Sequence, residues 1–376
     1  NYTTAAKTTY TWNGGSGNCS EPTKWTPAVV PGAVDSAIIV TTGTITLTTD
    51  ITISGLSYTS ANLTVDYNFL VSRTMTWNGG VIMGPGVITI DAGATLQLSG
   101  GNQQTLRRDL VNNGTTIWDA GNFALFDAAA FTNNGTFIDQ HSSPEPLSGG
   151  IYGCVFNNYG NYTKTGNTLS TLSLPFYNSG SLVLQVGSLS LSGEGTSTGS
   201  INVGNGSLLK IEGSPGWDIS GPLTGAGTVE FWITTTIRGI YNVTGNSVFA
   251  NQATTFDTSS TIVSLNNGQQ LVVTGTLEFN TGDVIYIDSL YLNGRLQGSD
   301  SVIIVESMNW AGQVMQGSGV TTIDLNATLR LSGGNQQTLR RDLINNGTTI
   351  WDAGNFALFD AAAFTNNGTF IDQHSS

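Results

Sequence analysis

The chain of 376 residues is poor in charge and rich in glycine: charged residues make up 10% of it, against roughly 25% in an average globular chain, and 48 residues are glycine. A hydrophobic fraction of 39% is enough for a core and argues against a disordered chain. The net charge of −13 argues against nucleic acid and anionic membranes as partners, and no apolar run approaches the roughly 20 residues of a transmembrane helix.

Residues 1–36 are predicted to form an irregular N-terminal segment that serves as a cap or as a docking element. They carry glycine, proline and asparagine at loop spacing, together with Trp12 and Trp25. The sequence starts at Asn1 without a methionine, which we interpret as a processed product or an excised part. From Ala37 onward, short alternating runs such as AIIV, TITLTT and ITISGL predict short strands.

A long internal repeat organises the rest of the sequence. Leu98–Ser143 returns as Leu331–Ser376, and over these 46 residues only Val111 differs, being replaced by Ile344. A weaker correspondence extends the duplicated unit to residues 70–143 and 303–376, so the chain is predicted to be a repeat protein. The first copy is followed by more sequence of the same kind. We therefore expect the second copy to present, unoccupied, the surface on which residues from 144 onward stack in the first.

Corners recur at the spacing of solenoid coils. Segments with an apolar residue, asparagine and then glycine begin at Leu110, Phe131, Phe156 and Phe176, which are 21, 25 and 20 residues apart. A period of about 20 to 25 residues is typical of one coil of a parallel β-solenoid, and residues 37–376 would hold roughly 15 to 19 coils. Glycine is expected to supply a positive φ at each corner, and the asparagine amides are expected to bond from coil to coil. The alternative is hairpins in β-sandwich domains, because Asn-Gly is also the commonest hairpin turn, but no unit of about 100 residues repeats.

Several stretches carry a resemblance to a known group of proteins. FNNYGNYTKTG, GPLTGAGTVEF, GVITIDAGATLQLSG and the opening TWNGGSGNCSEPTKW resemble very large secreted bacterial β-helix proteins of the filamentous-haemagglutinin and autotransporter-passenger type. The resemblance covers most of the chain from about residue 10, with Cys19 where a tryptophan is expected. It implies an all-β, right-handed parallel β-helix located outside the cell or at its surface and used as a stalk, adhesin or matrix component.

Residues with the chemistry for catalysis are few. The two histidines, His141 and His374, occupy the same repeat position and are interpreted as exposed loop residues, since no Gly-x-Ser-x-Gly elbow accompanies them. Six aspartates have the chemistry of a glycosidase pair or a Ca²⁺ site but are interpreted as solvated charges at strand edges; they are Asp119, Asp127, Asp139, Asp352, Asp360 and Asp372. The sequence therefore predicts no catalytic residue, cofactor or metal site, and no enzyme.

The cysteines and tryptophans leave alternatives open. Cys19 and Cys154 match no metal or redox spacing, so they either pair within the chain, pair between chains or remain thiols. Trp118 and Trp351 lie in alternating strands, where a core position competes with a role as a platform for stacking sugars.

The predicted function is structural: an extracellular β-helix subunit that polymerises head-to-tail into a surface or biofilm-matrix filament, with a second copy of itself as partner. The predicted assembly interface joins Tyr10, Trp12 and Trp25 to Phe364, Asn366, Asn367, Phe370 and Ile371. A disulfide between Cys19 and Cys154 of neighbouring copies would lock such a polymer. The alternatives are an adhesin or stalk that binds glycans or host surfaces without self-assembly, a carbohydrate-active β-helix enzyme, and a piece of a longer array whose open end is covered by further sequence.

Overall fold

The structure is a computed structural model that describes residues 7–150, 153–266 and 268–374. It is all-β, with 57% of the described residues in strands, and these form a parallel β-solenoid of about 17 turns. The predicted fold class is therefore confirmed, and the β-sandwich alternative is wrong. The chain divides into two compact units, Asn1–Gly193 and Glu194–Ser376, which are described in turn.

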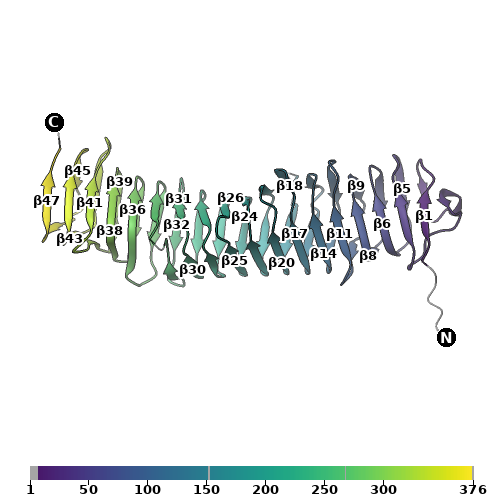
Figure 1. Ribbon diagram of the computed structural model, residues 1–376, viewed down its shortest axis with the longest axis horizontal. Coiled ribbons are helices and arrows are strands. Elements are labelled where there is room, and N and C mark those ends of the chain that lie inside the picture. Colours follow the sequence, from purple (N-terminus) through teal and green to yellow (C-terminus); the bar gives the residue numbers. More distant parts are fainter. Residues whose placement is uncertain (1–6, 151–152, 267, 375–376) are drawn as a thin grey trace. The chain divides into compact units, whose positions relative to one another are not determined.

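The first unit consists of three parallel ladders, one on each side of a coil (Figure 1). The first ladder contains β1 (Thr9–Trp12), β4 (Ser36–Ile39), β6 (Ile51–Tyr58), β8 (Phe69–Trp77), β11 (Thr95–Leu98), β14 (Thr115–Trp118), β17 (Thr136–Asp139), β20 (Asn161–Lys164) and β23 (Ser181–Leu184). The second contains β2 (Gly17–Asn18), β5 (Thr44–Leu47), β7 (Asn62–Val65), β9 (Gly80–Met83), β12 (Gln104–Arg107), β15 (Phe123–Leu125), β18 (Glu145–Gly149), β21 (Leu169–Ser173) and β24 (Ser188–Ser197). The third uses β6 and β8 again and continues through β10 (Ile88–Ile90), β13 (Leu110–Asn112), β16 (Ala130–Asn133), β19 (Val155–Asn158) and β22 (Phe176–Asn178).

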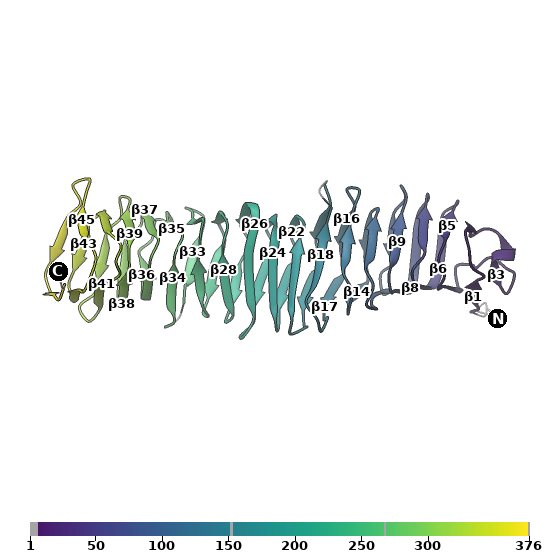
Figure 2. The same ribbon diagram turned by 90° about the horizontal axis from the view of Figure 1, so that it is seen from above.

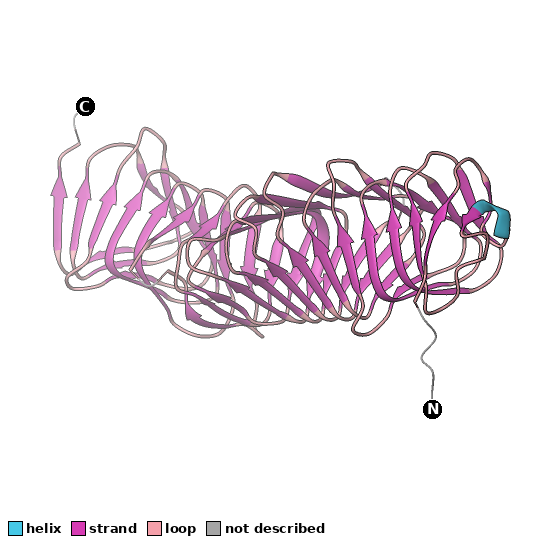
Figure 3. Ribbon diagram, turned by 45° about the vertical axis from the view of Figure 1, so that its right-hand side comes forward, coloured by secondary structure: helices cyan, strands magenta, loops and turns pink. Residues whose placement is uncertain are grey.

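The N-terminal segment closes the first coil of this unit. β1 pairs in parallel with β4 and antiparallel with β3 (Trp25–Thr26), and the short 3-10 helix η1 (Pro22–Lys24) lies between β2 and β3 (Figure 3). Trp12 and Trp25 are buried edge-to-face, with ring centroids 5.1 Å apart. We call residues 8–35 the N-terminal cap, because its tryptophans shield the apolar interior of the first coil from water.

The second unit also consists of parallel ladders, two longer and two shorter ones within the described residues (Figure 2). One ladder contains β26 (Leu208–Ile219), β28 (Thr228–Phe231), β31 (Ser247–Phe249), β34 (Gln270–Val273), β36 (Ile285–Leu292), β38 (Val302–Trp310), β41 (Thr328–Leu331), β44 (Thr348–Trp351) and β47 (Thr369–Asp372). A second uses β26 again with β29 (Thr235–Ile237), β32 (Ala253–Phe256), β35 (Thr276–Phe279), β37 (Arg295–Gly298), β39 (Gln313–Gln316), β42 (Gln337–Arg340) and β45 (Phe356–Leu358). Two shorter ladders consist of β25 (Ser200–Val203), β27 (Leu223–Gly225), β30 (Ile240–Val243) and β33 (Thr261–Ser264), and of β36, β38, β40 (Thr321–Ile323), β43 (Leu343–Asn345) and β46 (Phe364–Asn366).

The core is filled by alternate residues of each strand. In β14, Thr116 and Trp118 point inward and are buried, while Thr115 and Ile117 are only partly covered. Successive coils place aromatic rings above one another, and the rings of Phe137 and Tyr162 stack with centroids 5.0 Å apart. The alternation of apolar and polar residues in the sequence thus corresponds to side chains that point alternately into the core and to the surface. Trp118 is a core residue and not a sugar platform.

The corner glycines are required for a reason other than the predicted one. Gly135, Gly160 and Gly180 do not adopt a positive φ, so that expectation is wrong at these corners. A Cβ on Gly160 would instead lie 2.0 Å from the carbonyl oxygen of Gly135, and one on Gly180 would lie 2.0 Å from that of Gly160. Each coil rests so closely on the previous corner that only glycine leaves room for the carbonyl group.

The predicted asparagine ladder is present in both units. In the first unit Asn112 donates its side-chain N–H to Asn133, Asn133 donates to Asn158, and Asn158 donates to Asn178, each over 2.7 Å. In the second unit Asn345 donates to Asn366 over 2.7 Å. Each buried amide thereby fixes the register of one coil on the next, because a shift would leave polar groups unpaired in the core.

We expect Asn133→Ala to destabilise the chain by about 1–3 kcal/mol, because it removes three side-chain hydrogen bonds, to Asn112, Asn158 and the Asn161 carbonyl. It also leaves the buried Asn158 side-chain oxygen without its donor. Asn134→Ala is the matched control. Asn134 is the next residue, is exposed and bonds Asn113 over 2.9 Å, and its loss should cost less than about 0.5 kcal/mol. Urea unfolding followed by circular dichroism compares the two variants, and equal midpoints would contradict the role of the ladder.

Candidate functional site

The outer surface of the last described coils is apolar and open. It is formed by β45, β46, β47 and the loops beside them, which lie at the yellow end of the ribbon in Figure 1. Phe370 is 37% exposed and Ile371 36%, and Leu358 and Phe359 are exposed as well. We call this the C-terminal coil surface. Solvent-exposed apolar groups next to an unpaired strand edge are typical of a surface that accepts another strand.

The first copy of the repeat shows most of this surface covered, although Phe126, the counterpart of Phe359, stays exposed there. Phe137, which corresponds to Phe370, is 0% exposed, and Phe131, which corresponds to Phe364, is also fully buried. They are covered by β18, β19 and β20, whose strands run parallel to β15, β16 and β17. Since the two sequences are identical here, the difference in exposure arises only from the coil that follows.

Polar groups on this surface follow the same pattern. Asn133 donates to Asn158 of the covering coil, whereas its counterpart Asn366 donates back to the Gly368 carbonyl of its own corner over 3.2 Å. His374 is exposed and stacks on Trp351, with ring centroids 5.1 Å apart. The hydrogen-bonding groups that a covering coil engages in the first copy therefore face solvent in the second.

The structure separates the predicted interface residues into two groups. On the C-terminal coil surface, Asn366, Asn367, Phe370 and Ile371 are exposed and Phe364 is partly exposed. Tyr10, Trp12 and Trp25, in contrast, are buried inside the N-terminal cap and are not available to a second copy. An interface at that end can use only the outer face of the cap.

A second cluster, which the sequence analysis missed, lies buried in the first unit. Asp139 accepts hydrogen bonds from Tyr162 over 2.8 Å and from Ser170 over 2.5 Å, and it lies 3.4 Å from the ammonium group of Lys164. Lys164 donates to Ser170 over 2.7 Å, and His141 Nε2 lies 3.2 Å from Asp139 and 3.0 Å from Ser170 Oγ. The side chains of Asp139, His141 and Lys164 are 0% exposed. We call these five residues the buried polar cluster.

Two interpretations from the sequence are corrected here. His141 is not an exposed loop residue and Asp139 is not a solvated edge charge, although their counterparts His374 and Asp372 are exposed. The alternation of β20 carried a signal for the cluster, since it places Lys164 on the inward side with Tyr162. A lysine at an inward position requires a buried acceptor, and Asp139 occupies the paired position one coil earlier.

The cluster lacks the geometry of a catalytic relay. Asp139 and Ser170 both contact Nε2 of His141, while Nδ1 faces the hydroxyl of Thr168 at 3.2 Å. A relay would need the carboxylate and the hydroxyl on opposite nitrogens. Burial lowers the pKa of Lys164 and raises the pKa of Tyr162 well above its ordinary value. The arrangement therefore holds one coil on the next.

Cys19 and Cys154 do not form a disulfide with each other within the described chain. Both are buried, and no disulfide joins them in the described part of the chain. Cys19 lies beside β5 and Cys154 follows β18, which is five strands further along the same ladder. At about 4.8 Å per strand this separation is far beyond the reach of a disulfide.

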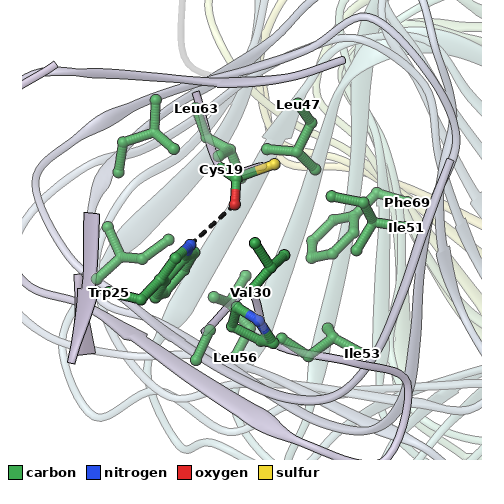
Figure 4. Close-up of a pocket in the computed structure, with 13 residues that line it drawn as sticks. Cys19, Trp25, Val30, Leu47, Ile51, Ile53, Leu56, Leu63 and Phe69 are labelled. Atoms are coloured by element: carbon green, nitrogen blue, oxygen red, sulfur yellow. Dashed lines mark hydrogen bonds between the residues drawn. The ribbon is translucent and has the colours of Figure 1, made fainter. Parts of the chain in front are cut away.

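Cys19 instead lines a small apolar cavity of about 40 Å³ beneath the cap (Figure 4). Trp25 closes it on one side and donates its indole N–H to the Cys19 carbonyl over 2.8 Å. Burial raises the pKa of the Cys19 thiol to about 11, so the thiolate needed for disulfide exchange is scarce at neutral pH. A disulfide lock between copies would require this cap to open.

Neither a metal centre nor a membrane-spanning helix is found among the described residues. Residues 7–150, 153–266 and 268–374 contain no group of three or more histidine, cysteine, aspartate or glutamate side chains that would hold a metal ion. Within the same ranges, no helix has the length and apolar character needed to cross a membrane.

No protein-family model, curated protein or solved structure matches this chain. The class of protein that its structure defines is a parallel β-solenoid of the repeat type.

Proposed function

We propose that this chain is an extracellular structural protein whose β-solenoid extends by stacking one copy on the next into a filament. The resemblance to secreted bacterial β-helix proteins supports a location outside the cell. The C-terminal coil surface of one copy receives the outer face of the N-terminal cap of another.

One observation carries this proposal: in the first copy of the repeat, a coil of this same chain covers this sequence in parallel register. The covering coil buries Phe137 completely and continues the hydrogen bonds of β17 in parallel register with β20. The C-terminal coil surface has the same side chains and the same strand edge, so a coil of similar shape fits it. A second copy is the occupant we assign, because a coil of this same chain is what covers the surface where it is buried.

The chemistry of the contact is strand addition. The outer edge of β47 offers backbone N–H and C=O groups for hydrogen bonds with another strand. The apolar side chains around this edge become shielded from water when a second copy binds. On the partner, β2 pairs with β5 on one side, and its other edge has no strand partner within the described residues. A contact between two different surfaces of one chain does not close on itself, so repetition gives a filament.

Sedimentation over a concentration series tests this proposal. The wild-type chain should gain mass as its concentration rises, while Phe370→Glu should remain monomeric because a charge replaces an apolar contact. Tyr286→Glu is the control, since Tyr286 is more exposed than Phe370 and lies on β36, away from the C-terminal coil surface. A monomeric wild-type chain, or assembly of Phe370→Glu equal to that of the wild type, would overturn the proposal.

A further inference from the structure

A polar groove of about 500 Å³ runs across successive coils of the second unit. It is lined mainly by the side chains of Glu278, Gln297 and Gln316, with Arg340 and Asp360 at one end. Its volume lies within the range of roughly 300–1,000 Å³ that is usual for small-molecule sites.

The side chains in this groove form an ordered row. Gln316 donates to Gln297 over 2.8 Å, and Gln297 donates to Glu278 over 3.2 Å. Asn280 donates to the other oxygen of Glu278 over 2.9 Å. Each glutamine amide carries two N–H donors, and the row uses one of them, which leaves the second donor in a fixed orientation.

Arg340 continues the row on the next coil, where it pairs in register with Gln316. Its guanidinium group bonds Asp360 over 2.5 Å and lies 4.9 Å from the centre of the exposed Phe359 ring. The opposite charges of Arg340 and Asp360 offset each other, which leaves the carboxylate of Glu278 as the net charge of the row. That carboxylate already accepts hydrogen bonds from Asn280 and Gln297, so the groove offers many hydrogen bonds around a single negative charge. Such a surface suits a neutral ligand that carries several hydroxyl groups.

The first unit provides an internal comparison. The strand register there places Thr46, Thr64 and Met83 in a row that leads to Arg107. Arg107 keeps its pair with Asp127, as Arg340 does with Asp360, but the carboxylate and the two amides are replaced by hydroxyl and thioether groups. Of the two arginine–aspartate pairs, only Arg340–Asp360 lies beside a polar row. Since the coils of the first unit form without such a row, the row is not required for coil stacking.

We infer that the Glu278–Gln297–Gln316 row is a binding site for a linear neutral glycan that lies across the coils. The row repeats at the coil spacing of about 4.8 Å, which is comparable with the length of one pyranose ring, so successive sugars meet successive side chains. The amides and the carboxylate bond pairs of hydroxyl groups, and the Phe359 ring offers an apolar face beside them. This site does not depend on the stacking of copies.

Titration calorimetry with the full chain tests this inference, using linear hexasaccharides of glucose, xylose and mannose as probes. We expect at least one probe to bind with a dissociation constant on the order of 0.1–1 mM. The variant Glu278→Thr/Gln297→Thr/Gln316→Met, which carries the residues of the first unit, should bind at least tenfold more weakly with an unchanged melting temperature. Conversely, Thr46→Glu/Thr64→Gln/Met83→Gln should add a second site of similar affinity.

Either of two results would overturn the inference. One is that the wild-type chain binds none of the three hexasaccharides. The other is that the variant with a replaced row binds as tightly as the wild type, which would place any glycan site elsewhere on the chain.

Discussion

Phe137→Ala is expected to destabilise the chain by about 3–5 kcal/mol, whereas Phe370→Ala is expected to cost less than about 1 kcal/mol. These are the same residue of the same repeat. Phe137 is fully buried, and its ring packs against Phe156 at 5.3 Å and Tyr162 at 5.0 Å, both from the covering coil. Phe370 lacks that coil and touches Phe364, with ring centroids 5.8 Å apart.

Urea unfolding at low protein concentration, followed by circular dichroism, measures this difference. Because solenoids do not always unfold in a single step, the midpoint of the first transition is the quantity to compare. Similar midpoints for the two variants would show that the covering coil contributes little to the burial of Phe137, and would contradict the description of the two surfaces given above.

Lys164→Met is the second substitution with a large expected effect. It should destabilise the chain by about 3–5 kcal/mol, because it leaves the carboxylate of Asp139 buried without its cation. The double variant Asp139→Asn/Lys164→Met should recover most of that loss, since it removes both charges together. Asp372→Asn is the control, because Asp372 occupies the same repeat position in an exposed place.

Thermal melts of the three variants separate the explanations. If Lys164→Met alone is as stable as the wild type, the carboxylate of Asp139 does not need its lysine partner. If the double variant is no better than the single one, packing and not charge is what Lys164 contributes.

Much of the fold could be predicted because each coil of the solenoid repeats the same short sequence patterns. The spacing of the corners at Phe131, Phe156 and Phe176 was enough to predict coils, and the asparagine beside each corner predicted the ladder that the structure contains. The alternation in β14 left a core position and a sugar platform open for Trp118, and the structure places this residue in the core. Each of these features depends on a residue and its immediate neighbours.

The parts that were missed depend on residues from different coils. The role of Gly160 follows from a carbonyl group one coil earlier, at Gly135, and no local pattern reveals that contact. In the same way, His141 was interpreted as exposed because the residues that enclose it, among them Lys164 and Ser170, lie 23 and 29 positions further along the chain. The sequence 139–141 is identical to 372–374, so it alone does not distinguish a buried site from an exposed one.

A truncation of the N-terminal cap would not be a clean probe of assembly. Removing the residues before Val30 would strip Trp12 and Trp25 from the interior of the first coil and would expose the cavity beneath the cap. If such a deletion variant failed to assemble, the cause could be either unfolding of the first coil or the loss of a contact between copies. Phe370→Glu avoids this ambiguity, because Phe370 is already exposed to solvent.

Electron microscopy of negatively stained wild-type chain and Phe370→Glu, over the same concentration series, tests the stacking of copies most directly. We expect unbranched fibres that lengthen with concentration in the wild type, and short particles of uniform length in the variant. Particles of one length at every concentration of the wild-type chain would contradict the account.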